Sequence, residues 1–128
     1  MKRLMMACAM VFGIGSLYAH HSMNGFDRTK SVTLTGTVKQ FKWANPHSWI
    51  EMEVPGEKGV TVWNVEMTAP GILAKAGWKS TFLKEGDKVT VVVRPMVNGD
   101  PGGLFVSVTL PDGRVFSERG QQTGAQTK

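Results

Sequence analysis

The chain has 128 residues, of which 41% are hydrophobic and 20% charged, and its formal net charge is +5. This length fits a single domain. The basic residues are scattered and form no block of five or six, which argues against a nucleic-acid-binding protein. No apolar run approaches the ~20 residues that a membrane-spanning helix needs, so we expect no transmembrane segment.

The first 19 residues have the pattern of a cleavable signal peptide. Lys2 and Arg3 give a basic start, an apolar stretch follows over residues 4–14, and the small residue Ala19 ends the segment. Cleavage after Ala19 predicts an exported protein of 128 − 19 = 109 residues.

The predicted mature chain is less basic than the whole sequence. Removing Lys2 and Arg3 leaves 15 − 2 = 13 basic residues against 10 acidic residues, a net charge of +3. The single cysteine, Cys8, leaves with the signal peptide, so the fold does not depend on disulfides.

A short N-terminal segment, residues 20–30, precedes a pattern of short strands that we expect to form one domain over residues 31–117. Residues 31–43 alternate apolar and polar side chains, and Gly36 in their middle predicts a bend or bulge. Asn45 and Pro46 predict a turn. Strands are then predicted over 48–54 and 60–67, with a hairpin turn at 55–59.

The second half of the chain changes character at residues 69–78, which predict a short helix with Pro70 in its first turn and Gly77 near its end. A fourth strand is predicted over 88–95, after a turn at 85–87. A fifth is predicted within 104–117, with a hairpin at Asp112-Gly113 and a short return segment. The polar residues 118–128 predict a disordered tail.

Three strands, a short helix and two further strands give the element order of an OB-fold, so we predict an all-β, five-stranded OB-fold-like barrel with one short helix. The alternative is another small barrel or sandwich in which the helix acts as a plug.

Several motifs together resemble a family of small periplasmic proteins of unknown function from Gram-negative bacteria. They are AHHSM, FD, VTLTGTV, FKWANPHSWIEMEV, WNVEM and GWKSTFLKEGDKV, and the most specific is NPHSW. The resemblance covers about residues 19–110. It implies a periplasmic location and an OB-like barrel, and it implies no activity.

Signal cleavage after Ala19 would give His20 a free α-amine beside its imidazole, and the two nitrogens can chelate one metal ion. A third nitrogen from His47 completes a ligand set that suits copper in tetragonal geometry. This set is similar to the histidine brace of copper oxygenases and copper carriers. His21 is a competing ligand, and Met23 can add a thioether for Cu(I).

A metal-free interpretation of the same residues stays open. The N-terminal histidines can simply be solvated, and the His47 ring can bond a backbone carbonyl in its turn. Asp27 can either orient a histidine as a partner of a metal ligand or serve as a turn acid.

Alternation also predicts an outer face with aromatic and polar side chains. Residues expected there are Phe41, Trp43, Trp49, Glu51, Asn64 and Glu66, and Trp49, Trp43, Glu66 and Asn64 are candidates for ligand binding. Trp43 is, with Trp63 and Trp78, also a candidate for the core. Glu66 can act near His47 or pair with a lysine.

The sequence thus predicts a binding protein rather than a catalyst. No serine has a plausible histidine and acid partner, and no phosphate-binding glycine loop follows a strand. The leading hypothesis is a copper-binding protein, and the alternative is a metal-free module that binds a partner protein or small ligand on its aromatic face. A third possibility is an oxidative copper enzyme.

Overall fold

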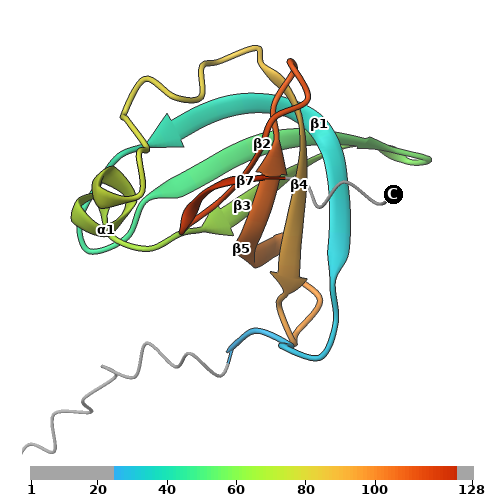
Figure 1. Cartoon of the computed structure of the whole chain (residues 1–128). Coiled ribbons are helices and arrows are strands. Elements are labelled where there is room, and N and C mark those ends of the chain that lie inside the picture. The colour runs from blue at the N-terminus through green and yellow to red at the C-terminus, as the bar shows by residue number, and fades with distance from the viewer. Residues whose placement is uncertain (1–24, 124–128) are drawn as a thin grey trace, which may run out of the picture.

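The computed structural model describes residues 25–123 (Figure 1). The predicted signal peptide, His20, His21 and Met23 lie outside these residues. Within them, no helix is long and apolar enough to cross a membrane.

The described chain forms seven strands, all in one connected sheet, and one short helix. The elements are β1 (Val32–Lys42), β2 (Trp49–Gly56), β3 (Gly59–Glu66), α1 (Pro70–Lys75), β4 (Lys88–Pro95), β5 (Gly102–Thr109), β6 (Val115–Ser117) and β7 (Gly120–Gln122).

The first five strands close into a barrel. Their order is β3-β2-β1-β4-β5, and a parallel pairing of β3 with β5 joins the two ends. This is the connectivity of an OB-fold and confirms the predicted five-stranded OB-fold-like barrel. Figure 1 shows β1 arching over the molecule, since this one strand pairs with both β2 and β4.

The first strand is irregular, as predicted, but its register shift lies a few residues after Gly36 rather than at Gly36 itself. β1 pairs with β4 up to Thr37 and with β2 from Thr37 onward, and its register with β2 shifts between Val38 and Gln40. A Cβ atom on Gly36 would collide with the backbone carbonyl of Glu53. Only glycine therefore lets β2 approach β1 at the point where β1 changes partners.

Gly36→Ala is expected to lower the free energy of unfolding by roughly 1–3 kcal/mol, because the backbone of β2 must move away from the new methyl group. Urea unfolding followed by circular dichroism measures the loss. The matched control is Gly71→Ala in α1, where an added Cβ meets nothing within 4 Å and helix propensity predicts a gain of up to ~1 kcal/mol. Equal effects at both positions would contradict the close-approach explanation.

The core lies inside the barrel and under α1, with Trp78 as its largest fully buried side chain. The Trp78 indole Nε1 donates a hydrogen bond to the Ser117 carbonyl at 2.8 Å. Trp43 and Trp63 are partly buried and pack against this core. The three tryptophans considered for the core thus all contribute to it, although only Trp78 does so with its whole side chain.

The ordered structure continues beyond the predicted domain boundary at residue 117. The sequence predicts disorder from residue 118, but residues 120–122 form β7, which pairs with β6. The Glu118 side chain also accepts a hydrogen bond from the Thr68 amide at 2.7 Å. Backbone pairing and a side-chain acceptor, rather than apolar alternation, hold this last hairpin, so the pattern of apolar residues does not predict it.

Candidate functional site

The pairing of β2 with β3 arranges the predicted outer face. Trp49 lies opposite Glu66, and Glu51 lies opposite Asn64. The alternate residues Ile50, Met52 and Val65 are fully buried. Because residues directly opposite in an antiparallel pair share a face, Trp49, Glu51, Asn64 and Glu66 lie together on the outside of the barrel.

The end of β1 departs from the predicted arrangement. Phe41 was expected on the outer face, but it pairs with the buried Ile50, and its ring lies 6.1 Å from that of Trp78. The register shift between Val38 and Gln40 reverses the alternation, which turns Phe41 inward. Trp43, just after β1, packs edge-on against Phe41 at 5.8 Å between ring centroids.

His47 and Glu66 contact each other through the imidazole Nδ1 and the carboxylate Oε1. The His47 side chain is 44% exposed and that of Glu66 is 19% exposed. The backbone beside His47 is held in place, since the Ser48 amide donates to the Thr68 carbonyl at 3.1 Å and the Met67 amide donates to the Ser48 carbonyl at 2.8 Å. The pair therefore lies at a fixed rim of the barrel and reaches solvent.

The contact decides which histidine nitrogen is available for a ligand. A carboxylate oxygen only accepts hydrogen bonds, so in the neutral ring Nδ1 carries the proton and Nε2 keeps its lone pair. Histidines that ligate metals are commonly oriented by such a carboxylate. Glu66 was expected either near His47 or paired with a lysine, and it contacts His47. The nearby lysines Lys39 and Lys42 pair instead with Glu51, at 2.9 and 3.6 Å.

A second carboxylate, Glu118, lies close enough to His47 for the two charges to interact. Sequence patterns do not single out Glu118, because it falls in the predicted tail. Burial raises the pKa of Glu118 above its ordinary value, while the hydrogen bond from the Thr68 amide and the charge of His47 act in the opposite direction. The ionised form of Glu118 is therefore disfavoured in the folded protein.

Glu118→Gln is expected to increase stability relative to the parent at neutral pH and to lose this advantage below pH 4.5. A carboxyl group whose folded pKa is raised stabilises the fold below its ordinary value of 4.5 and loses this contribution as pH rises through the raised value. Glutamine cannot ionise and still accepts from Thr68. Melting temperatures at both pH values test this, with Glu57→Gln in the exposed β2–β3 turn as control. A pH-independent difference would contradict it.

Residues 25–123 contain no group of three or more histidine, cysteine, aspartate or glutamate side chains arranged to hold a metal ion. His47 with Glu66 is therefore at most part of a metal centre. The other predicted ligands, His20 and His21, lie outside the described residues.

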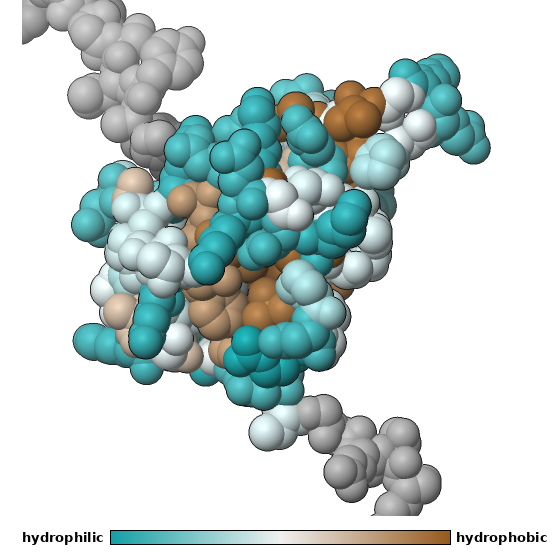
Figure 2. All heavy atoms as spheres, turned by 90° about the horizontal axis from the view of Figure 1, so that it is seen from above, coloured by the Kyte–Doolittle hydropathy of each residue, from teal (hydrophilic) through white to brown (hydrophobic). Residues whose placement is uncertain are grey.

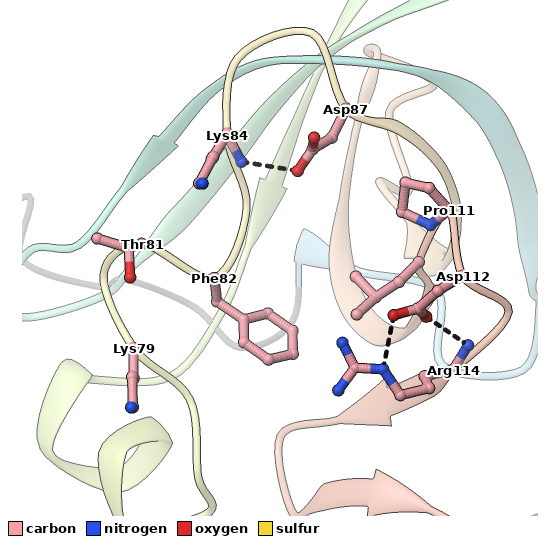
Figure 3. A pocket seen from close by; sticks show the side chains of 9 residues that line it. Lys79, Thr81, Phe82, Lys84, Asp87, Pro111, Asp112 and Arg114 are labelled. Carbon is pink, nitrogen blue, oxygen red and sulfur yellow. Dashed lines mark hydrogen bonds and ion pairs between the residues drawn. The ribbon is translucent and has the colours of Figure 1, made fainter.

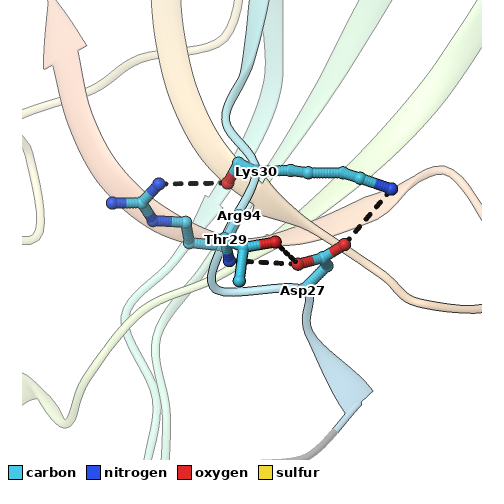
Figure 4. A network of polar contacts seen from close by, with 4 residues as sticks. All are labelled: Asp27, Thr29, Lys30 and Arg94. Atoms are coloured by element: carbon cyan, nitrogen blue, oxygen red, sulfur yellow. Dashed lines mark hydrogen bonds and ion pairs between the residues drawn. The ribbon is translucent and has the colours of Figure 1, made fainter.

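Asp27 takes part in a turn before β1, one of its two predicted roles (Figure 4). The N-terminal histidines that its other predicted role involves lie outside the described residues. The Asp27 carboxylate accepts hydrogen bonds from the Thr29 hydroxyl at 2.6 Å and the Thr29 amide at 3.0 Å, and it pairs with Lys30 at 3.3 Å. The hydroxyl and amide of Thr29 hold the pKa of Asp27 below its ordinary value. Arg94 stabilises the same turn by donating a hydrogen bond to the Lys30 carbonyl at 3.0 Å.

An open pocket of about 450 Å³ lies apart from these residues, between the loop that precedes β4 and the turn after β5. Figure 3 shows that both carboxylates of the pocket already accept hydrogen bonds: Asp87 from the Lys84 amide and Asp112 from Arg114. None of the predicted site residues lines the pocket.

The surface also carries a hydrophobic patch. Seen from above, this patch is surrounded by hydrophilic side chains (Figure 2).

The described chain is thus a small OB-like barrel with a histidine–carboxylate pair at its rim. Residues 9–106, well over half of the chain, match the model of the Family of unknown function (DUF6152), and the chain belongs to this family. Comparisons with curated proteins and with solved structures found no match. The predicted resemblance to an uncharacterised family is confirmed to this extent.

Proposed function

We propose that this protein is an exported, periplasmic copper-binding protein in which His20, as the processed N-terminus, and His47 hold one copper ion, with His21 as a further ligand. The observation that supports this most is the contact between His47 Nδ1 and Glu66, which leaves Nε2 for a metal. The role is to carry or buffer the ion rather than to catalyse a reaction.

The ligand set consists of nitrogens. The α-amine and imidazole of His20 would supply two of them and His47 Nε2 the third, a combination that suits tetragonal Cu(II) better than a hard cation such as Mg²⁺. Since the described residues contain no complete metal-binding group, the ligands from outside residues 25–123 are necessary to the proposal.

The described chain begins at a place from which His20 can approach the rim. The Gly25 carbonyl accepts a hydrogen bond from the Val97 amide at 2.9 Å, and Phe26 forms a bridge with Met96. Gly25 lies five positions after His20 in the sequence, and five extended residues span up to ~17 Å.

The distance from Phe26 to Glu66 can be counted across the neighbouring strands that lie between them. The Met96 amide donates to the Gly102 carbonyl at 3.2 Å, and Gly102 pairs with Asn64, two residues before Glu66. Three strand spacings of ~4.8 Å and two residues along β3 give a separation on the order of 15 Å. The segment before Gly25 is therefore long enough to reach His47.

The test is a titration of mature protein beginning at His20 with Cu(II). We expect tight binding of about one equivalent, and we expect a version with one additional alanine before His20 to lose most of this affinity because its α-amine is displaced. Equal affinity of the two forms would show that the amine is not a ligand. Mass spectrometry of the exported protein checks that His20 is its first residue.

A metal-free interaction module is the second candidate, supported by the position of Trp49. This side chain lies on the outer face between Lys42 of β1 and Glu66 of β3 and offers a partly exposed ring for a partner protein or a flat ligand. Trp49→Ala is expected to abolish partner binding while leaving the Cu(II) titration unchanged.

A further inference from the structure

The hairpin of β2 and β3 extends beyond the barrel. The pairing of β2 with β1 ends at Glu53, and the pairing of β3 with β5 begins only at Asn64. Residues 54–62, here called the β2–β3 arm, therefore have strand partners only within this hairpin. Figure 1 shows the arm in green, projecting to one side of the barrel.

The register shows which backbone N–H and C=O groups of the arm are open, that is, face away from β2 with no strand beside them. The Asn64 amide donates to the Pro101 carbonyl, so the N–H and C=O of Asn64 point away from β2. Backbone groups alternate sides along a strand, and Val60 and Val62 therefore direct theirs to the same side. At these two residues the pairings of the described chain place no strand on that side.

The two edges of the arm differ in their protection against pairing. On β2, Pro55 lies opposite Val60, at a position whose amide would face away from β3. Proline has no N–H, which blocks the outer edge of β2 to another strand. The corresponding edge of β3 has neither proline nor charge between Gly59 and Asn64, and its Val60 is 65% exposed.

We propose that the open edge of β3 is a dimer contact with a second copy of the chain. The two β3 strands run antiparallel about a two-fold axis at Thr61, so that Val60 of one copy pairs with Val62 of the other. This register uses the open N–H and C=O groups of both valines and joins the barrels by four main-chain hydrogen bonds. Such a contact is isologous, with the same surface used twice.

The side chains favour a second copy over an unrelated strand because the edge is complementary to itself. Thr61 faces Thr61, a pairing that antiparallel strands favour. Gly59 faces Trp63 of the other copy, where the absence of a side chain leaves room for the indole. No charged residue lies between positions 59 and 64, so two positively charged copies can approach along this edge without like charges in contact.

Sedimentation velocity over a concentration series tests the proposal on the mature protein, with Val62→Pro as the decisive variant. Proline at this position removes the open N–H and leaves the β2–β3 bonds intact. We expect parent protein to shift from monomer to dimer with rising concentration, and Val62→Pro to weaken dimerisation roughly tenfold or more. Val62→Ala keeps the N–H and is expected to dimerise within a few-fold of the parent.

Two results would overturn the dimer contact: a parent protein that stays monomeric up to millimolar concentration, and a Val62→Pro variant that dimerises like the parent. If the parent stays monomeric and also binds an extended peptide through β3, the edge belongs to a different partner. Circular dichroism establishes that Val62→Pro is folded. The copper proposal is independent of this edge, since Val62→Pro is expected to bind Cu(II) normally.

Discussion

Trp78→Ala is expected to lower the free energy of unfolding by about 3–5 kcal/mol, as large aromatic truncations in cores do. Trp78 is only 2% exposed, and its ring contacts those of Phe82, Phe105 and Phe116 at centroid distances of 4.6, 5.7 and 6.0 Å. The loss is a large share of the 5–15 kcal/mol that stabilises a typical domain, so unfolding at a clearly lower urea concentration than in the parent is expected. Urea titration followed by circular dichroism measures it.

Two further variants separate ring packing from the indole hydrogen bond. Trp78→Phe keeps an aromatic ring but loses the bond to the Ser117 carbonyl, and is expected to cost about 1–3 kcal/mol. Ile72→Ala, at a side chain of α1 that is 56% exposed, is expected to change stability by less than ~0.5 kcal/mol. If Trp78→Ala also changed stability by less than ~0.5 kcal/mol, Trp78 would not be the centre of the core.

The barrel could be predicted because alternation and turn residues report on burial directly. The alternation that predicts Trp49, Glu51, Asn64 and Glu66 on the outer face leaves the residues between them for the core. Of these, Ile50, Met52 and Val65 are fully buried. Phe41 was misplaced because the irregularity between Val38 and Gln40 changes the phase of the strand without changing its composition. Period counting alone cannot locate such a shift.

The candidate site was predictable only in its parts. His47 and Glu66 could each be selected from residue type and position, but their contact depends on the β2–β3 register and on the turn before β2. Glu118 could not be selected, because it approaches the rim through a hairpin of polar residues that carries no apolar periodicity. The sequence therefore shows candidate ligands, while the fold decides which of them meet.

On the proposed copper site, Glu66→Gln is expected to reduce Cu(II) affinity by roughly tenfold to a hundredfold, the usual effect of losing a carboxylate that orients a histidine ligand. The amide keeps the size of the side chain but holds the His47 ring less firmly and no longer makes Nε2 more basic. Competition titration of mature protein against a chelator of known affinity measures the change.

Glu51→Gln is the matched control, because it makes the same chemical change on the same outer face, at a carboxylate that binds Lys39 and Lys42 rather than His47. Its copper affinity is expected to equal that of the parent. His47→Ala removes a ligand outright and is expected to weaken binding more than Glu66→Gln. Equal effects of Glu66→Gln and Glu51→Gln would mean a general loss of negative charge. In that case the contact between His47 and Glu66 would have no part in holding the metal.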